Sequence, residues 1–185
     1  MTFVCATRTE ARAARKAGQR AAVVGVGVRR PLPEGRLVSF GLAGALHEGL
    51  DVADVLDATR VVDADGRTLW EGEPLGVQGA KRATLLAVDR VSDDPAERRV
   101  LHQRTGADAA DMESGALARS GRLRGCVRAI SDTPSATLGP LAEMLDGNGR
   151  LSWRGIGRAT LRPRETARSL SRVRLALRRL GEVSP

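Results

Sequence analysis

The sequence predicts an α/β protein whose central sheet is mostly parallel or mixed. Two observations support this fold class. Short apolar runs, of the kind that form buried strands, alternate with segments of helical character along most of the chain. In addition, 21 Gly and 8 Pro provide turns between these segments. At 185 residues the chain is long enough for one domain with a real core. We expect residues 1–150 to form its body and residues 151–185 a basic helical extension.

The strands are predicted from apolar runs bounded by turn residues. In chain order they span residues 2–6, 21–28, 36–46, 54–65, 83–91, 107–110 and 127–130. The second strand ends in Gly25 and Gly27, whose backbone N–H groups can approach an anion, although the pattern alone is weak evidence for an anion site and favours a plain turn. The third strand enters a bend of small residues at Gly41–Gly44, which leaves room for a ligand or a neighbouring backbone. Residues 72–81 are predicted to form a loop.

The helices are placed by their capping signals. They are predicted over residues 10–18, 96–105, 112–120 and 163–180. Thr7 or Thr9 caps the first helix, so Glu10 lies in its first turn, where the helix dipole favours a carboxylate. Pro95 suits the first position of the second helix, after a cap at Asp93 or Asp94, and Gly121 ends the third.

Most of the net positive charge lies in the C-terminal segment that contains the last predicted helix. The net charge is +8, and the segment from Leu151 onward holds nine Arg and two Glu, so the rest is nearly neutral. Within this helix an apolar stripe follows helical spacing at Leu170, Val173, Leu177 and Leu180. One interpretation is a helix packed on the domain with a solvated basic face. The other is weak, reversible contact with an anionic membrane surface.

Composition excludes several classes of function. The chain has only 2 Phe and 2 Trp and no Tyr, which argues against specific nucleic-acid binding by base stacking. Cys5 and Cys126 lie within apolar runs and are expected to be buried thiols, and no histidines have zinc-site spacing, so we expect no metal. No signal peptide or membrane span is apparent, which predicts a cytoplasmic protein, and the basic C-terminal helix adds the alternative of a peripheral protein at the inner membrane face.

Two acidic clusters lie where predicted strands end. Asp111, Met112 and Glu113 follow the strand at 107–110, and Ser131-Asp132 follows the strand at 127–130. In open α/β sheets, ligands bind beyond the carboxyl ends of strands. These clusters therefore predict the functional site.

The same residues carry a resemblance to a known family. The chain resembles the purine and uridine phosphorylase superfamily, which includes methylthioadenosine/S-adenosylhomocysteine nucleosidases. The resemblance lies in four features: ADMESGALA with Met112-Glu113, VRAISD ending at Asp132, SFGLAGAL at Ser39–Leu46, and the acidic Glu10 after the first strand. Within the superfamily, LVSFGLAGAL, AVDRVSDDPAERRVLHQRTGADAADMESGALA and SLSRVRLALRRL are most similar to bacterial hopanoid-associated phosphorylases. The resemblance implies a three-layer fold, a homodimer or larger oligomer, and release of adenine from a 5′-substituted adenosine.

The resemblance also implies roles for individual residues. Glu113 would hold the ribose 2′- and 3′-hydroxyls, with Met112 packed against the sugar. Asp132 would give a proton to the departing purine, which requires a pKa raised by burial. Phe40 and Ser131 are the candidates for contact with the base. Asp111 is expected to be a neighbouring structural carboxylate.

The nucleophile is left open by the sequence. Phosphate, the expected co-substrate of a phosphorylase without other cofactors, would be bound by Gly25, Gly27, Arg29 and Gly41. Water would need a base, and Glu10 suits that role. The resemblance to hopanoid-associated phosphorylases favours phosphate and adenosylhopane as substrates. The alternative is a hydrolytic methylthioadenosine/S-adenosylhomocysteine nucleosidase.

Two features depart from the pattern of the family. Leu42 occupies a turn position where many members carry Ser or Thr, so a hydrogen-bond donor is missing. The chain is also short between Gly27 and Leu37 and between Asp57 and Ala83. A shortened lid would open the site to a bulky lipid tail, or it would mark a catalytically inactive nucleoside-binding relative.

Overall fold

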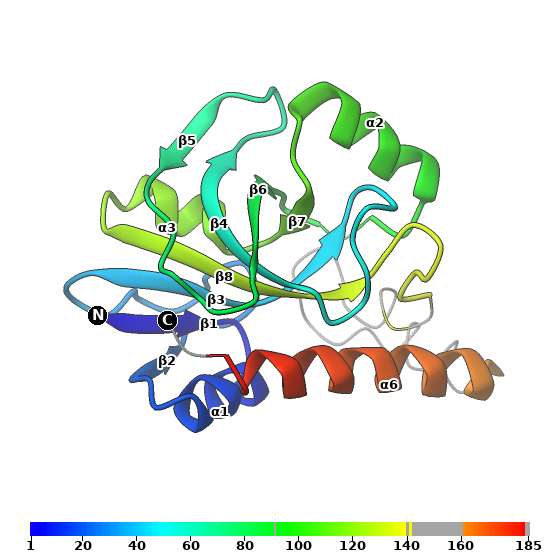
Figure 1. The fold of residues 1–185 in the computed structure, drawn as a ribbon, viewed down its shortest axis with the longest axis horizontal. Helices are drawn as coiled ribbons and strands as arrows, with labels where there is room; N and C mark the ends of the chain where they lie inside the picture. The colour runs from blue at the N-terminus through cyan, green and yellow to red at the C-terminus, as the bar shows by residue number, and fades with distance from the viewer. Residues whose placement is uncertain (91, 140, 142–160, 184–185) are drawn as a thin grey trace.

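The computed structural model describes residues 1–90, 92–139, 141 and 161–183, which form a mixed eight-stranded sheet with helices on both sides (Figure 1). The strands are β1 (Thr2–Cys5), β2 (Ala21–Val23), β3 (Leu37–Ala45), β4 (Val55–Val62), β5 (Thr68–Glu71), β6 (Lys81–Ala87), β7 (Ala109–Asp111) and β8 (Leu123–Asp132). The helices are α1 (Arg8–Lys16), α2 (Pro95–Thr105), α3 (Ser114–Arg119) and α6 (Pro163–Leu180).

Five of the strands close into a ring. β3 pairs antiparallel with β7, β7 parallel with β6, β6 parallel with β4, β4 antiparallel with β8, and β8 parallel with β3. β1 and β2 extend the sheet from β3 in parallel, while β5 forms an antiparallel pair with β4. The prediction of a mixed sheet is confirmed, and closure leaves the ring strands paired on both sides.

The helices form layers on opposite sides of this sheet. α1 and α6 pack against each other, and α6 lies along β8 and β3 (Figure 1). α3 packs against β4, β5 and β6 on the other side. The predicted three-layer arrangement is therefore confirmed.

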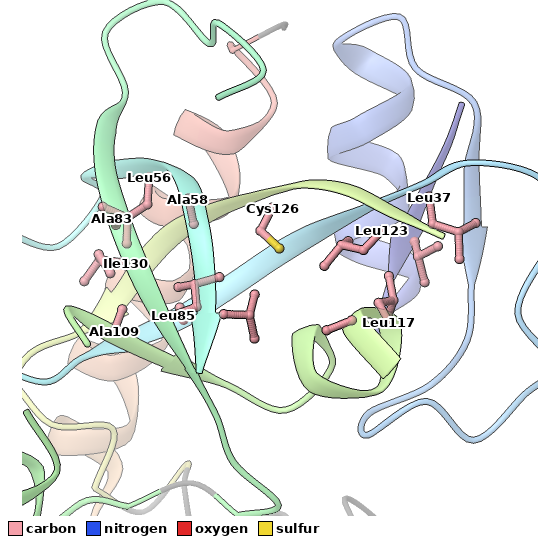
Figure 2. Packing of buried hydrophobic residues seen from close by; sticks show 14 of the residues in the cluster. Leu37, Leu56, Ala58, Ala83, Leu85, Ala109, Leu117, Leu123, Cys126 and Ile130 are labelled. Atoms are coloured by element: carbon pink, nitrogen blue, oxygen red, sulfur yellow. The ribbon is translucent and has the colours of Figure 1, made fainter. Parts of the chain in front are cut away.

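The core consists mainly of two apolar clusters, one on each face of the ring strands. The cluster on the α3 side includes Leu37, Leu56, Leu85, Leu117, Cys126 and Ile130 (Figure 2). The cluster between the sheet and helices α1 and α6 includes Phe3, Val38, Phe40, Ala176 and Leu180. β3 contributes Leu37 to the first and Val38 to the second, because successive side chains of a strand point to opposite faces.

The carboxyl ends of several strands meet at one edge of the molecule. β1, β3 and β8 run parallel, and Gly44 of β3 lies opposite Asp132 of β8. Asp111 at the end of β7 lies opposite Ala87 at the end of β6. Residues that are far apart in the sequence thereby share one end of the sheet, as the α/β prediction required.

The second strand is shorter than predicted. It ends at Val23, and the following residues turn, because Gly25, Gly27 and Val28 have positive φ values of 84°, 67° and 57°. Among the described residues from Val24 to Arg36 there is no helix, in keeping with the short connection noted in the sequence.

Other element boundaries also differ from the prediction. The bend expected at Gly41–Gly44 is wrong, since β3 continues to Ala45. The helix expected from Met112 begins at Ser114, so Met112 and Glu113 precede it. β8 is longer than the predicted strand at 127–130, and β5 lies where no separate strand is predicted. The boundary expected at residue 150 lies outside the described residues.

The basic helix α6 packs on the domain through one face. Ala176 and Leu180 are fully buried, whereas Leu170 and Leu175 are 38% and 52% exposed. The predicted apolar stripe is thus divided between the core and the surface. None of the helices that the structure describes is both long enough and apolar enough to cross a membrane.

The core assignment predicts a contrast between two leucines. Leu85 has no exposed surface, so Leu85→Ala should lower the free energy of unfolding by about 2–5 kcal/mol through lost burial and a residual cavity. Leu175→Ala, on the outer face of α6, is the matched control and should change it by less than about 0.5 kcal/mol. Denaturant unfolding followed by circular dichroism measures both, and equal losses would contradict this packing.

Candidate active site

A cavity of about 570 Å³ opens at the edge where the strand ends meet. It is lined by five of the residues that the sequence singled out: Glu10, Met112, Glu113, Ser131 and Asp132. These residues come from three separate stretches of chain, namely the first turn of α1, the connection between β7 and α3, and the end of β8. The fold therefore gathers the predicted polar groups around one space.

Glu10 is fixed by its own helix terminus and by β3. Thr7 and Glu10 form a capping box, in which the backbone N–H and hydroxyl of Thr7 donate to Oε2 at 2.7 and 2.9 Å. The backbone N–H of Leu42 donates to Oε1 at 3.1 Å. Both interpretations of Glu10 are thus compatible, because the carboxylate caps α1 and also lines the cavity. Leu42 contributes a backbone donor here in place of a side-chain hydroxyl.

The close approach of Glu10 depends on Gly41. A Cβ atom at position 41 would overlap Oε1 of Glu10 and would lie 3.1 Å from Nη1 of Arg128. Gly41 does not line the cavity, so its predicted contact with phosphate or water is not seen. Its role in the structure is to leave space for two charged side chains.

Glu113 is a buried carboxylate with few compensating partners. The backbone N–H of Gly27 donates to its Oε1 at 3.0 Å, and Arg128 lies 3.8 Å from its Oε2. Burial, followed by the negative charge of Asp111, raises the pKa of Glu113 to about 7, against the lowering effects of Arg128 and the Gly27 N–H. Glu113 is therefore poised to change charge near neutral pH. Met112 lies beside it on the cavity wall.

Arg128 organises the acidic side of the cavity from beneath. Its guanidinium group pairs with Asp111, donates to the Ser39 hydroxyl at 2.5 Å and is 1% exposed. Asp111 also accepts hydrogen bonds from the backbone and hydroxyl of Ser114. Asp111 is thus a supporting carboxylate, as its sequence context suggests. Arg128 was not predicted, although a charged residue within the apolar run VRAI is a signal that could have identified it.

Asp132 lies at the end of β8 in a second buried ionic group. The Ser131 hydroxyl donates to Oδ1 at 2.5 Å, and the guanidinium of Arg98 forms an ion pair with Oδ2. Burial raises the pKa of Asp132, while Arg98 and Ser131 act in the opposite direction. Arg98 belongs to α2 and was not predicted, because nothing in the sequence distinguishes it from the other arginines of that helix.

Two of the predicted site residues, Phe40 and Gly25, do not line the cavity. Phe40 is 1% exposed and packs edge to face on Phe3, with ring centroids 5.4 Å apart, so the expectation that it contacts a base is corrected. Its position on β3 points it into the core below α1 and α6. Gly25 does not line the cavity either; its backbone forms the turn after β2.

Gly27 and Arg29 lie on a neighbouring cavity. This second space, of about 700 Å³, adjoins the first at Met112 and is also lined by Arg119. The anion that the Gly27 N–H meets is the Glu113 carboxylate. Arg29 donates from Nε to the backbone oxygen of Val26.

The site offers acid–base groups. Within the described ranges, no group of three or more His, Cys, Asp or Glu side chains is placed to hold a metal ion. Cys5 and Cys126 are free and buried, as predicted, and burial raises the pKa of Cys5 to about 12. The available chemistry is a proton donor at Asp132, a carboxylate that can accept hydroxyl hydrogen bonds at Glu113, and a candidate base at Glu10.

The contact between Gly41 and Glu10 predicts a coupled effect on stability. Gly41→Ala should lower the free energy of unfolding by about 1–3 kcal/mol, because the added methyl group displaces a buried carboxylate held by three donors. In a Glu10→Ala background the same change should cost less, since the obstructing carboxylate is absent. Denaturant unfolding of the four proteins measures this coupling, and strictly additive effects would show that the two residues do not interact.

The raised pKa of Glu113 predicts a pH-dependent gain in stability on its neutralisation. As pH rises from 4.5 to about 7 the unfolded state releases this proton first, so the native protein loses stability relative to Glu113→Gln. The advantage of the variant should grow over this window by up to about 3 kcal/mol. Glu34→Gln, which removes an exposed carboxylate, is the control. Thermal unfolding between pH 4 and 8 measures both, and parallel curves for the two variants would refute the burial argument.

Comparison with solved structures relates this fold to known enzymes. The 5′-methylthioadenosine/S-adenosylhomocysteine nucleosidase of Neisseria meningitidis, solved with methylthio-immucillin-A, superposes with a TM-score of 0.58 at 15% identity, over 95% of this chain and 98% of that chain. The corresponding S. pneumoniae nucleosidase gives a TM-score of 0.55 at 15% identity, covering 97% and 98%. A futalosine hydrolase mutant of Helicobacter pylori gives 0.55 at 13% identity, covering 93% and 96%.

No protein-family model and no curated protein matches the chain. At identities of 13–15% the structural likeness establishes the fold. The predicted resemblance to the nucleoside phosphorylase and nucleosidase group is confirmed at that level, while the closer similarity to hopanoid-associated phosphorylases stays a prediction. The chain thus has the fold of the methylthioadenosine/S-adenosylhomocysteine nucleosidases and of futalosine hydrolase.

Proposed function

We propose that the protein cleaves the N-ribosidic bond of a 5′-substituted adenosine and releases adenine. The observation that carries this proposal is the single cavity lined by Glu10, Met112, Glu113 and Asp132. Its carboxylates come from separate stretches of the chain and differ in their partners. The solved nucleosidases with this fold include one in complex with methylthio-immucillin-A.

The ribose is assigned to the side of the cavity formed by Met112 and Glu113. Cleavage of the bond builds positive charge on the sugar, and an ionised carboxylate that accepts from the 2′- and 3′-hydroxyls stabilises that charge. The raised pKa of Glu113 means that it is ionised above about pH 7 in the free protein. Binding of the sugar supplies two hydroxyl donors, which favour the ionised form.

The purine is assigned to the side formed by Ser131 and Asp132. As the bond between the sugar carbon and the base breaks, its electron pair moves onto the base, and Asp132 gives a proton to a ring nitrogen. A pKa raised by burial keeps a larger fraction of Asp132 protonated at neutral pH. The leaving base is then neutral, and Asp132 is left as a carboxylate.

The acceptor of the sugar is proposed to be inorganic phosphate. Arg29 and Arg119 line the neighbouring cavity, which adjoins the first at Met112 on the sugar side. Two guanidinium groups at this place suit a phosphate anion. The proposal follows the resemblance to phosphorylases.

Water is the second candidate acceptor. The supporting observation is that Glu10 lines the cavity itself, whereas Arg29 and Gly25 do not. A carboxylate held by Thr7 and Leu42 is well oriented to take a proton from an attacking water. In this case the protein is a hydrolytic nucleosidase that acts on methylthioadenosine or S-adenosylhomocysteine.

The 5′ substituent is proposed to be a lipid, as in adenosylhopane. The cavity wall includes an apolar group formed by Leu42, Leu46, Leu101, Leu138 and Val173. Val173 belongs to α6, the helix whose outer face is rich in arginine. A lipid substrate is drawn from a membrane, so weak contact of this basic helix with an anionic membrane surface would bring the site close to its substrate. That contact stays a prediction, as does the expected homo-oligomer.

An adenine-release assay tests this proposal. The wild-type protein is incubated with adenosine, methylthioadenosine, S-adenosylhomocysteine and an adenosine that carries a long apolar 5′ group, each with and without inorganic phosphate. Adenine should appear only with phosphate, and fastest from the apolar derivative. Release without phosphate would establish the hydrolytic alternative. If no adenine forms while a nucleoside raises the melting temperature, the protein is a binding relative without turnover.

The role of Asp132 is tested in the same assay. Asp132→Asn keeps the shape of the side chain but cannot donate a proton of comparable acidity, so kcat should fall by about 10²–10⁴-fold. Ligand-induced thermal stabilisation should persist. Asp94→Asn, which changes a cap of α2 to an equally good capping residue, is the matched control and should keep full activity. An active Asp132→Asn protein would remove Asp132 from the acid role.

A further inference from the structure

Arg98 is an unusual residue for its helix. α2 lies on the surface, and Arg98 and Thr105 are its only buried residues. The Arg98 side chain is 2% exposed, although its neighbours Arg99 and Val100 are exposed. Burial of a guanidinium group is costly unless it is paired and its hydrogens are bonded. The fold therefore directs a charged side chain inward at this position.

Each branch of the Arg98 guanidinium has an acceptor. Nε donates to the backbone oxygen of Ser92 at 2.8 Å, and Nη1 donates to the backbone oxygen of Ala45 at 3.1 Å. Nη2 pairs with Oδ2 of Asp132. The two backbone contacts fix the plane of the guanidinium between α2 and β3. They therefore hold Nη2 in place independently of its contact with Asp132.

We propose that Arg98 is a positioning residue that orients the Asp132 carboxyl group and stabilises the carboxylate formed when Asp132 gives its proton to the leaving base. The proposal rests on the proposed function above. In this step the proton moves from Asp132 to the ring nitrogen of the base, the electron pair of the broken bond stays on the base, and Arg98 keeps all its protons. Arg98 touches no reacting atom of the substrate and acts through Asp132.

The surroundings of Asp132 suit this division of roles. Ser131 holds Oδ1, and Gly44 on β3 leaves space for Oδ2, since a Cβ there would lie 3.0 Å away. Asp93 lies 3.8 Å from Nη2 of Arg98 and is 29% exposed. It provides a second negative partner for Arg98, so the cation keeps a counter-ion while Asp132 is protonated.

Asp93 also links Arg98 to the cavity wall. Its two carboxylate oxygens accept from the backbone N–H groups of Leu138 and Gly139, at 2.8 and 2.7 Å. Leu138 lines the cavity. Arg90 and Glu97, which also line the cavity, pair with each other at 2.6 Å. Among the described ion pairs, Arg98 is the cation that contacts Asp132, and Asp93 is its other nearby carboxylate.

Two variants of Arg98 test the proposal. Arg98→Met removes the charge and keeps much of the length, and Arg98→Lys keeps the charge. Loss of the cation makes Asp132 harder to ionise. The alkaline limb of kcat/KM against pH, where Asp132 loses its proton, should therefore move to higher pH in Arg98→Met, and kcat should fall by about 10²-fold with little change in KM. Arg98→Lys should lie between this variant and the wild type, and the exposed Arg99→Met is the control.

A change of leaving group separates positioning from folding. In a nitrophenyl riboside the leaving group is nitrophenolate, which is stable as an anion and needs no proton from Asp132. With this substrate, Arg98→Met and Asp132→Asn should each lose less than about threefold in kcat. Losses as large as those on the adenine substrate would overturn the proposal, as would an unchanged pH profile in Arg98→Met. If Arg98→Met does not fold, the pH profile and leaving-group test of Arg98→Lys decide. Failure of the proposed function is distinct, because the wild type would then release no adenine at all.

Discussion

The buried ion pair between Arg128 and Asp111 is the interaction on which the candidate site depends. Arg128 is 1% exposed, lies in the middle of β8 and joins three strands, through Asp111 on β7, Ser39 on β3 and its own backbone. Because it is covered by protein, its charge must be matched locally. That requirement draws Asp111 inward, and the turn after Asp111 then presents Glu113 to the cavity. The buried pair of Arg128 and Asp111 thus sets the position of Glu113, the candidate for binding the sugar.

The closed ring of strands makes this concentration of charge possible. Strand ends that meet at one edge bring Glu10, Glu113 and Asp132 around one cavity, and glycines at positions 41 and 44 of β3 leave room for two of these carboxylates. Each is held differently: by a helix cap, by a single backbone N–H, or by an ion pair with Arg98. These separate environments allow similar carboxylates to take different roles.

Much of the fold and part of the site could be predicted from the sequence. Apolar runs and capping residues located most strands and helices, because both depend on local patterns of a few residues. Phe40 was misassigned because an aromatic residue in a strand can face either the ligand or the core, and the pairing with Phe3 decided for the core. Arg128 left a signal as a charge within an apolar run. Arg98 left none, since α2 also contains Arg99 and Arg104 and only the packing of that helix buries Arg98.

The sequence by itself determined the fold class, the order of its elements and the residue types available for chemistry, because strand and helix periodicity and the acidic residues after strands are properties of short segments. Only the tertiary structure decided which of these residues share a cavity. The closure of the ring, the pairing of Gly44 with Asp132 and the inward turn of Arg98 join segments far apart in the chain. The pKa values of Glu113 and Asp132 follow from that burial, which no local pattern specifies.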